Sequence, residues 1–231
     1  MRVWTGTSGF SYPEWKGKFY PKGLPAKKML SFYSGRFPTV EINASFYRMP
    51  SPETVAAWTH EVPDEFRFIL KAPQQITHRE RLKGSEETLA RFVEVSQQLG
   101  SRKGPFLFQL PPFFKVDVAR LQEFLALVPK TERVAFEFRH VSWFCDETYT
   151  ALREANAALC VADSEKLTTP FVATTNWGYL RLRDLEYDDA ALRQWAKQVQ
   201  AQSWTEAFVF FKHEESGKGP ELGRRFQAMV A

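Results

Sequence analysis

The chain has 231 residues, of which 44% are hydrophobic and 25% are charged, so it can bury a sizeable core and a disordered chain is excluded. No apolar run approaches the ~18 residues that a membrane helix needs, and we expect neither a membrane segment nor a secretory signal. Cys145 and Cys160 lie outside any C-x-x-C pair, which favours a reducing, cytoplasmic location. The net charge of +4 is compatible with anionic ligands, including nucleic acid, but a lysine-rich surface would give the same value.

Short apolar, β-rich runs alternate along the chain with amphipathic stretches, at a mean spacing of roughly 29 residues, the size of one strand–helix unit. The predicted strands are Val3–Thr5, Thr39–Asn43, Arg67–Lys71, Phe106–Leu110, Val134–Arg139, Leu159–Ala162, Tyr179–Leu182 and Phe208–Phe211.

The segments between these runs predict helices. Ser85 is a candidate N-cap of a helix that Gly100 closes, and Asp117 and Asp188 are candidate N-caps of two more. Eight strands alternating with helices predict one α/β domain, a TIM-type (β/α)₈ barrel over residues 1–231. A doubly wound open sheet is the alternative, but the glycine spacing after the first strand does not fit its G-x-G-x-x-G turn.

Side-chain parity predicts what faces the inside of the barrel. The bulky residues Val134, Phe136 and Phe138 should face the helices, so Glu137 and Arg139 should face inward. The same rule applied to the other strands places further polar side chains inside, mostly near the strand ends where barrel sites form. These are Glu41, Asn43, Lys71, Gln109, Tyr179, Arg181 and Arg183. The parity of the eighth strand is ambiguous.

Several motifs together resemble the domain-of-unknown-function 72, or YecE-like, family over essentially the whole chain. They are Gly6-Thr7-Ser8-Gly9-Phe10-Ser11-Tyr12, Trp15, Phe19-Tyr20-Pro21, Val40 to Tyr47, Phe68 to Pro73, Ile76-Thr77-His78, Phe108 to Pro112, and Glu137-Phe138-Arg139-His140 with Trp143. The resemblance implies a TIM barrel and supplies no settled activity. The chain has Arg181-Leu182-Arg183-Asp184 where many members carry Arg-Leu-His-Gly, and Lys212-His213 where many carry two asparagines, which makes its site more basic.

Glu41 and Glu137, on the second and fifth strands, are candidate catalytic residues, because two carboxylates across a pocket can perform general acid–base chemistry. The alternative is that each neutralises a neighbouring arginine or lysine. His78 and His140 follow strands on the same face and are candidate proton-transfer residues, or else structural caps of their loops.

Cations on this face predict an anion site, since arginine suits phosphate and carboxylate. Glycines around Lys218 could present backbone N–H groups to a phosphate at a helix start, or form an ordinary loop. Aromatic residues near the loops could stack on a sugar or base, although packing explains most of them; they are Trp4, Phe10, Tyr12, Trp15, Tyr47, Trp143 and Trp177. The predicted ligand-binding set is Tyr12, Asn43, Tyr47, Lys71, Gln109, Arg139, Trp143, Asp163, Arg181, Arg183, Lys212 and Lys218.

The four histidines carry no zinc motif, and we expect no cofactor, while a single Mg²⁺ on Glu41, Glu137 or Asp163 is left open. The leading hypothesis is an enzyme, a hydrolase, lyase or isomerase, acting on a small anionic, phosphorylated or sugar-like substrate. A nucleic-acid-binding or nucleic-acid-processing protein is the second hypothesis, and a ligand-binding barrel without chemistry is the third. The oligomeric state is left open.

Overall fold

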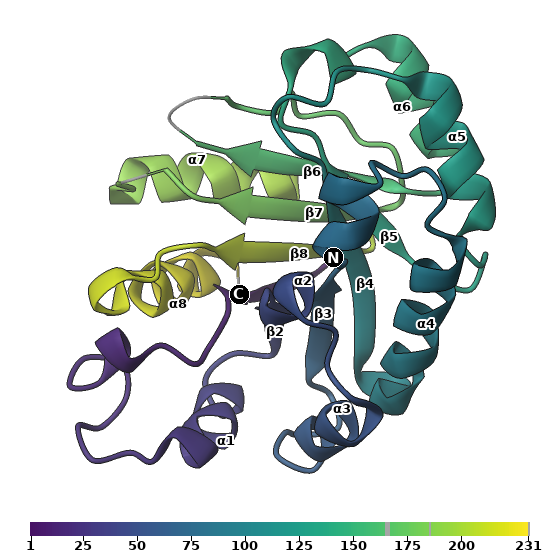
Figure 1. Cartoon of the computed structure of the whole chain (residues 1–231). Helices are drawn as coiled ribbons and strands as arrows, with labels where there is room; N and C mark the ends of the chain where they lie inside the picture. Colours follow the sequence, from purple (N-terminus) through teal and green to yellow (C-terminus); the bar gives the residue numbers. More distant parts are fainter. Residues whose placement is uncertain (165–166, 185, 231) are drawn as a thin grey trace.

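A closed barrel of eight parallel strands forms the centre of the computed structural model, which describes residues 1–164, 167–184 and 186–230 (Figure 1). The strands pair in sequence order, and β8 pairs with β1 to close the ring. They are β1 (Arg2–Ser8), β2 (Thr39–Ile42), β3 (Arg67–Lys71), β4 (Lys103–Gln109), β5 (Val134–Glu137), β6 (Ala158–Asp163), β7 (Trp177–Leu182) and β8 (Glu206–Phe211). The predicted TIM barrel and its eight strands are confirmed. The fifth strand ends two residues early, so Phe138 and Arg139 belong to the following loop.

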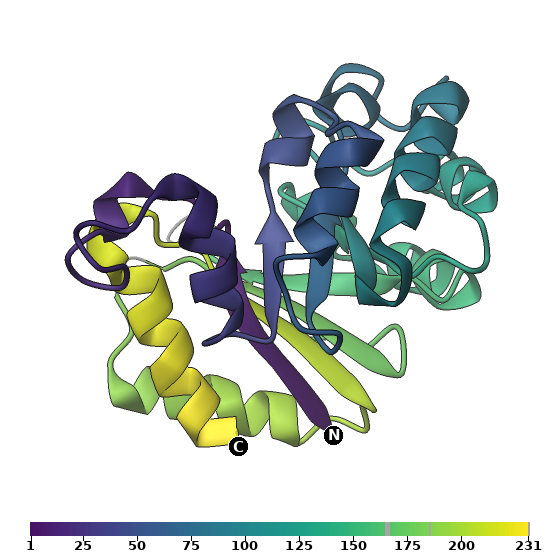
Figure 2. The ribbon, with the colours of Figure 1, turned by 90° about the horizontal axis from the view of Figure 1, so that it is seen from below.

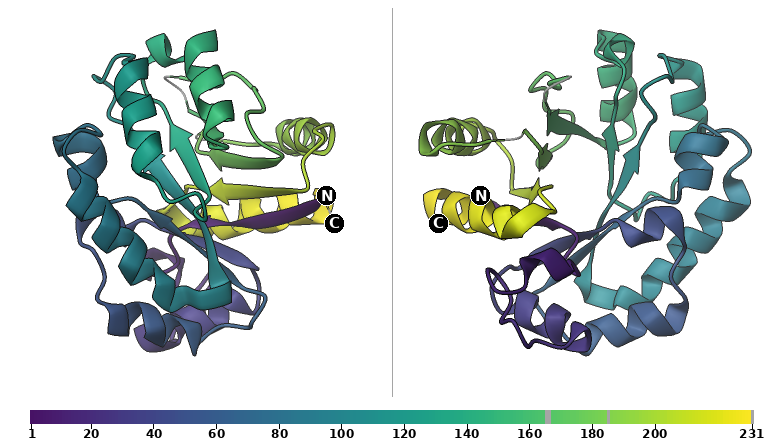
Figure 3. Two further views of the ribbon diagram at one scale, coloured as in Figure 1. Left: turned by 90° about the vertical axis from the view of Figure 1, so that its right-hand side faces the viewer. Right: turned by 60° about the vertical axis from the view of Figure 1, so that its left-hand side comes forward.

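Helices surround the ring, with α3 to α6 on one side and α7 and α8 on the other (Figure 3). They are α1 (Met29–Ser34), α2 (Ala44–Tyr47), α3 (Pro52–Thr59), α4 (Glu86–Ser96), α5 (Val118–Leu127), α6 (Asp146–Glu154), α7 (Asp189–Gln200) and α8 (Lys218–Val230). The last helix lies beside α7, and it also packs against β1 (Figure 2).

Two of the three predicted N-caps work as expected. Asp117 accepts from the Arg120 N–H at the start of α5, and Asp188 accepts from the Ala191 N–H at the start of α7. The prediction for Ser85 is confirmed in position only. Ser85 occupies the N-cap position of α4, but its side chain makes no capping hydrogen bond.

The connection from β6 to β7 differs from the other long connections, because its described residues, 164 and 167–176, form no helix. Thr174 fixes the segment to the barrel. Its hydroxyl accepts from the Leu159 N–H and donates to the Ala157 carbonyl. Phe171 stacks on Trp204, 5.6 Å between ring centroids, which covers the outside of the barrel where a helix would otherwise lie. The segment therefore follows the outside of the barrel from the end of β6, where the Thr169 N–H bonds to the Ala162 carbonyl, to the start of β7.

Parity correctly separates the two faces of the sheet. The barrel interior is a compact apolar cluster of Trp4, Ile69, Leu107, Ala135, Ala158, Cys160, Trp177, Tyr179, Phe208 and Phe210. This cluster settles the ambiguous eighth strand, because Phe208 and Phe210 face inward. The outward residues Phe136 and Phe138 pack under the helices.

Two aromatic residues expected on the active face lie at the opposite end. Trp177 begins β7, and the Trp4 indole N–H donates to Glu206, which begins β8 (2.6 Å). Arg133 also pairs with Glu206, so these groups close the N-terminal end of the barrel. No helix in the described ranges has both the length and the apolarity needed to cross a bilayer.

Candidate functional site

A fully buried arginine ties together the two inward carboxylates at the C-terminal end of the barrel. Arg181, on β7, has no exposed surface. Its Nε and Nη2 donate to Glu41 Oε1 at 3.1 and 2.8 Å, and its Nη1 pairs with Glu137. The Tyr179 hydroxyl donates to the other Glu41 oxygen at 2.6 Å. Glu41 and Arg181 therefore form the sealed floor of the site, where neither can touch a ligand directly.

Glu137 connects this floor to two more exposed arginines. Its Oε1 lies 3.6 Å from Arg139 Nε and 3.5 Å from Arg183 Nη1. Burial alone would raise the pKa of Glu137, but Arg181, Arg183 and Arg139 together hold the pKa well below its usual range. The carboxylate is thus ionised at neutral pH, which favours charge neutralisation over the acid–base role predicted for it.

Lys71 ends β3 beside this network. Its Nζ donates to Gln109 Oε1 at 2.9 Å and lies 4.0 Å from the centre of the Phe46 ring. Burial, with Arg181 as the next cause, lowers the pKa of Lys71 to about 7. The predicted residues Lys71, Gln109 and Glu137 thus come together on adjacent strands.

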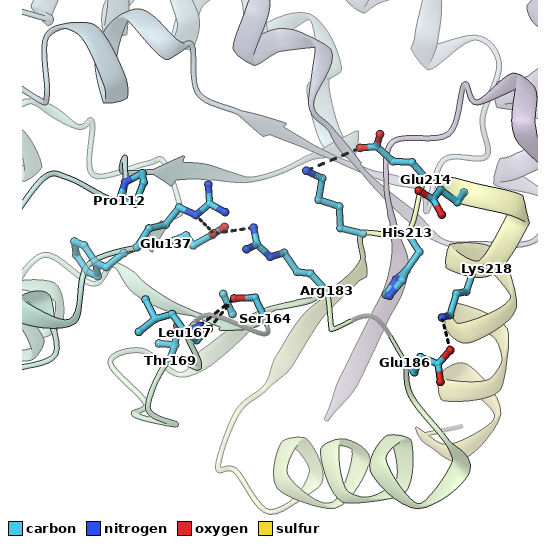
Figure 4. A pocket seen from close by; sticks show the side chains of 15 residues that line it. Pro112, Glu137, Ser164, Leu167, Thr169, Arg183, Glu186, His213, Glu214 and Lys218 are labelled. Carbon is cyan, nitrogen blue, oxygen red and sulfur yellow. Dashed lines mark hydrogen bonds and ion pairs between the residues drawn. The ribbon is translucent and has the colours of Figure 1, made fainter.

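A cavity of about 930 Å³ opens above this layer (Figure 4). Arg183 points into it towards Glu137 in the close-up view. The lining residues come from the C-terminal ends of β5 and β6, from the segments that follow β4 to β8, and from the start of α8, as expected for a barrel site. They are Pro112, Glu137, Phe138, Arg139, Ala162, Ser164, Leu167, Thr169, Arg183, Glu186, Lys212, His213, Glu214, Glu215 and Lys218.

The rim of the cavity carries carboxylates as well as cations. Lys212 Nζ lies 3.9 Å from Glu214, and Lys218 Nζ lies 3.8 Å from Glu186 (Figure 4). Burial, followed by Arg181, lowers the pKa of Lys212. The excess positive charge is therefore concentrated in the inner part of the site.

The glycine-rich segment around Lys218 leads into α8, but it does not present free backbone N–H groups to an anion as predicted. The Lys218 N–H bonds to the Glu215 carbonyl in a short 3₁₀ turn that runs into α8. A Cβ on Gly219 would lie 2.7 Å from the His213 carbonyl oxygen, so glycine allows the helix start to pack against this residue. The Lys218 side chain lines the cavity as predicted, while its N–H is occupied within the chain.

Three residues of the predicted ligand-binding set do not line this cavity. Trp143 does not fit its predicted ligand-binding role, because it is fully buried, stacks on Phe138 at 4.6 Å and donates to the Phe114 carbonyl. Asp163 faces the Tyr187 hydroxyl, which donates to it at 2.7 Å. Tyr47 is 74% exposed and lies on a second, separate cavity.

The predicted histidines do not line the main cavity. His140 Nδ1 accepts from the Ser142 N–H and caps a short 3₁₀ turn, which is the structural alternative left open for it. His78 hydrogen-bonds to the Thr77 hydroxyl through Nδ1 and packs edge-on against Phe46. Burial, with Lys71 as the next cause, lowers the pKa of His78.

Tyr12 and Asn43 remain near the site without lining the cavity. The Tyr12 hydroxyl donates to the Ser8 carbonyl at 2.7 Å, and burial raises its pKa above the ordinary value. The side-chain amide of Asn43 is enclosed, and neither its nitrogen nor its oxygen has a hydrogen-bond partner among the described residues. Their ligand-binding roles stay predictions.

Sequence reasoning missed His213 as a wall residue. Its Nε2–H donates to the Asp184 carbonyl at 2.6 Å, and burial lowers its pKa. His213 lies two residues beyond the end of β8, where strand parity no longer determines direction. The loop residues Ser164, Leu167 and Thr169 were also missed, because no motif marks an extended β6–β7 connection.

The carboxylates considered for Mg²⁺ are engaged elsewhere. Glu41 and Glu137 pair with Arg181, and Asp163 accepts from Tyr187. In residues 1–164, 167–184 and 186–230, no three His, Cys, Asp or Glu side chains group closely enough to hold a metal ion. The geometry therefore gives no support to a Mg²⁺ site on these residues.

The sequence model described as "Protein of unknown function DUF72" matches residues 4–231. The chain belongs to the DUF72 family. It is 28% identical to UPF0759 protein YunF of Bacillus subtilis (strain 168), over 91% of this chain and 89% of that protein. It is 29% identical to UPF0759 protein YecE of Escherichia coli (strain K12), over 62% of this chain and half of that protein.

Solved structures support the barrel. A DUF72 family protein from Thermotoga maritima MSB8 is 27% identical with a TM-score of 0.86, covering 100% of this chain and 99% of that one. The glycoside hydrolase family 5 enzyme PbGH5A from Prevotella bryantii B14 is 10% identical with a TM-score of 0.52, covering 98% of this chain and 95% of that one. The second likeness concerns the fold alone.

Proposed function

We propose that this DUF72 protein is an enzyme that binds a small substrate carrying a phosphate or carboxylate group in the cavity above Glu137. The observation that carries the proposal is the charge balance around the floor. Three guanidinium groups, those of Arg139, Arg181 and Arg183, share two carboxylates, those of Glu41 and Glu137. An anion between Arg139 and Arg183 would complete this balance.

The two partly buried arginines, Arg139 and Arg183, are suited to such a ligand. Arg139 and Arg183 keep 33% and 15% of their side-chain surface, whereas Arg181 has none. Their contacts with Glu137 are long, at 3.6 and 3.5 Å, so their guanidinium groups retain donors for an anion. A phosphate bound between Arg139 and Arg183 would meet guanidinium groups that are already partly buried. Its attraction to them is stronger than in bulk water, because the effective dielectric constant there is lower.

Glycoside cleavage by Glu41 and Glu137 is less well supported. A glycosidase needs one protonated carboxyl as general acid, with a raised pKa. The pKa of Glu137 is held in the opposite direction, and Glu41 belongs to the sealed floor. A proton-transfer group is therefore better sought on the cavity wall, where His213 lies.

A reducing, cytoplasmic location fits this proposal, because Cys145 and Cys160 are both free thiols. The thiol of Cys160 lies inside the barrel, and burial raises its pKa well above the ordinary value. It is therefore an inert packing group, with no role in the proposed chemistry.

Isothermal titration calorimetry with inorganic phosphate, pyrophosphate and a panel of sugar phosphates tests the binding step. Arg183→Met should weaken phosphate binding about 10- to 150-fold, which corresponds to ~1.5–3 kcal/mol for a hydrogen bond to a charged group. Arg225→Met is the matched control, because Arg225 pairs with Asp189 on the surface. Equal affinities for the wild-type protein and both variants would refute the proposal.

A second candidate function, single-stranded nucleic-acid binding, is favoured by the other cavity. This cavity has a volume of about 500 Å³ and includes Tyr47, Arg48, Arg79 and Arg91 in its lining. Exposed aromatic rings stack on bases, and arginines bind phosphates. Oligonucleotide affinity should then fall steeply between 50 and 200 mM salt and drop in Arg79→Met. Binding that is absent or independent of salt would exclude this candidate.

A further inference from the structure

Lys71 is a buried amine that lacks the partner a buried lysine ordinarily has. It is 8% exposed, and no carboxylate in the described part of the chain lies within 4.0 Å of its Nζ. Its contacts are the neutral amide oxygen of Gln109 and the face of the Phe46 ring. Buried charges are normally paired, so this environment is poorly suited to a permanent ammonium.

Lys103 provides the contrast within the same protein. Its side chain is 17% exposed, and its Nζ pairs with Glu132 Oε1 at 2.7 Å. This is the usual arrangement of a structural lysine: a carboxylate compensates the charge of the amine. Lys71 is more deeply buried than Lys103 and has no such partner, which makes packing alone a poor explanation for a lysine at this position.

The charged groups around Lys71 explain why neither nearby carboxylate forms an ion pair with it. The groups that act on it from the neighbouring elements are Arg181 on β7, Glu137 on β5, Glu41 on β2, Lys212 after β8 and His78 after β3. Arg181 occupies both carboxylates, and so the amine experiences an adjacent guanidinium together with burial. The fall in the pKa of Lys71 to about 7 follows from these two causes.

We propose that Lys71 is a nucleophilic lysine that forms an imine with the carbonyl carbon of a small anionic aldehyde or ketone. This inference rests on the proposed anion site and names the class of its substrate. The neutral amine attacks the carbonyl carbon and forms a C–N bond. The carbonyl C–O bond then breaks, and the oxygen leaves as water with the two amine protons, so the atoms and electrons balance.

Adjacent strands connect Lys71 to the anion site through Gln109. Lys71 is hydrogen-bonded to Gln109, and Gln109 is the register partner of Glu137, which lines the cavity beside Arg139 and Arg183. Arginines holding the anionic group would direct the other end of the molecule towards β3. Lys71 as a residue keeps 8% of its surface exposed, whereas Arg181 keeps none.

Reductive trapping tests the inference. The intact protein is incubated with glyoxylate or glyceraldehyde 3-phosphate and sodium cyanoborohydride, and the adducts are located by peptide mass spectrometry. We expect Lys71 to be labelled at least tenfold faster than Lys103, with a half-maximal rate near pH 7. Uncharged glyceraldehyde should label it at least tenfold more slowly. Lys71→Met removes the amine and should remove this adduct, while circular dichroism reports whether the variant folds.

The outcomes separate this inference from the proposed function. If phosphate binds in the Arg183-dependent manner but Lys71 is labelled no faster than Lys103, the imine is refuted and the anion site stands. If charged and uncharged aldehydes label Lys71 equally fast, the anionic substrate class is refuted. If phosphate does not bind at all while glyceraldehyde still labels Lys71 rapidly, the proposed anion site fails and the reactive amine remains.

Discussion

Replacing Arg181 with methionine should destabilise the fold more than any change at the rim of the cavity. Arg181 makes three charged hydrogen bonds, two to Glu41 and one to Glu137, and all three side chains are essentially inaccessible. Removing one partner from a buried ion pair costs about 3–5 kcal/mol. Because one arginine serves two carboxylates here, we expect a loss in the free energy of unfolding near the upper end, about 5 kcal/mol at pH 7.5.

The loss in the free energy of unfolding caused by Arg181→Met should grow as the pH rises. In the variant, Glu137 loses Arg181, the charge that does most to lower its pKa against the effect of burial, and we expect Glu137 to bind a proton in the fold at a pH where the unfolded chain is ionised. A folded state that binds more protons than the unfolded state loses stability as the pH rises. The deficit relative to wild type should therefore be smaller at pH 5.5 than at pH 7.5.

Urea unfolding at both pH values measures the deficit, with far-ultraviolet circular dichroism as the signal. The double variant Glu41→Gln, Arg181→Met is the control, because it removes one uncompensated carboxylate along with the arginine. It should be more stable than Arg181→Met alone at pH 7.5. A deficit below about 1 kcal/mol, or one that Glu41→Gln does not reduce, would refute the argument that Arg181 neutralises this floor.

Three further predictions concern packing and capping. Trp143→Ala should lower the free energy of unfolding by about 3–5 kcal/mol and leave phosphate affinity unchanged, since this ring is core; weaker phosphate binding in calorimetry would contradict its assignment. In Gly178→Ala the new Cβ would lie 2.2 Å from Trp204 Cζ3, so thermal melts should show a loss of about 1–3 kcal/mol, and an unchanged melting temperature would contradict this contact. Asp117→Ala should cost about 1 kcal/mol in urea unfolding because it removes a working N-cap, whereas Ser85→Ala should cost less than half as much; equal losses would contradict the observed caps.

Local sequence signals were sufficient for the strands and for the direction of most inward side chains. The alternation in Val134 to Glu137 distinguishes two faces, because the helices outside the barrel require bulky apolar groups and the packed interior admits the rest. Glu41, Lys71, Gln109, Glu137 and Arg181 were therefore placed correctly on one face. Parity fails beyond the strand ends, which is why the direction of His213 could not be predicted.

The partners of those side chains are separated by as many as 140 residues, and no local pattern contains that information. Sequence reasoning placed Glu41 and Glu137 on opposite sides of the ring, and only the closed barrel shows the Arg181 side chain reaching both. The same closure leaves Lys71 without a carboxylate, and packing against Phe138 and Phe114 outside the strands buries Trp143.

The sequence by itself thus determined the barrel, its C-terminal face and the kinds of charge gathered there, because periodicity and burial are properties of neighbouring residues. Only the tertiary structure decided which cations are neutralised and which amine lacks a carboxylate, because ion pairing depends on distances of a few ångströms between strands that are remote in the chain.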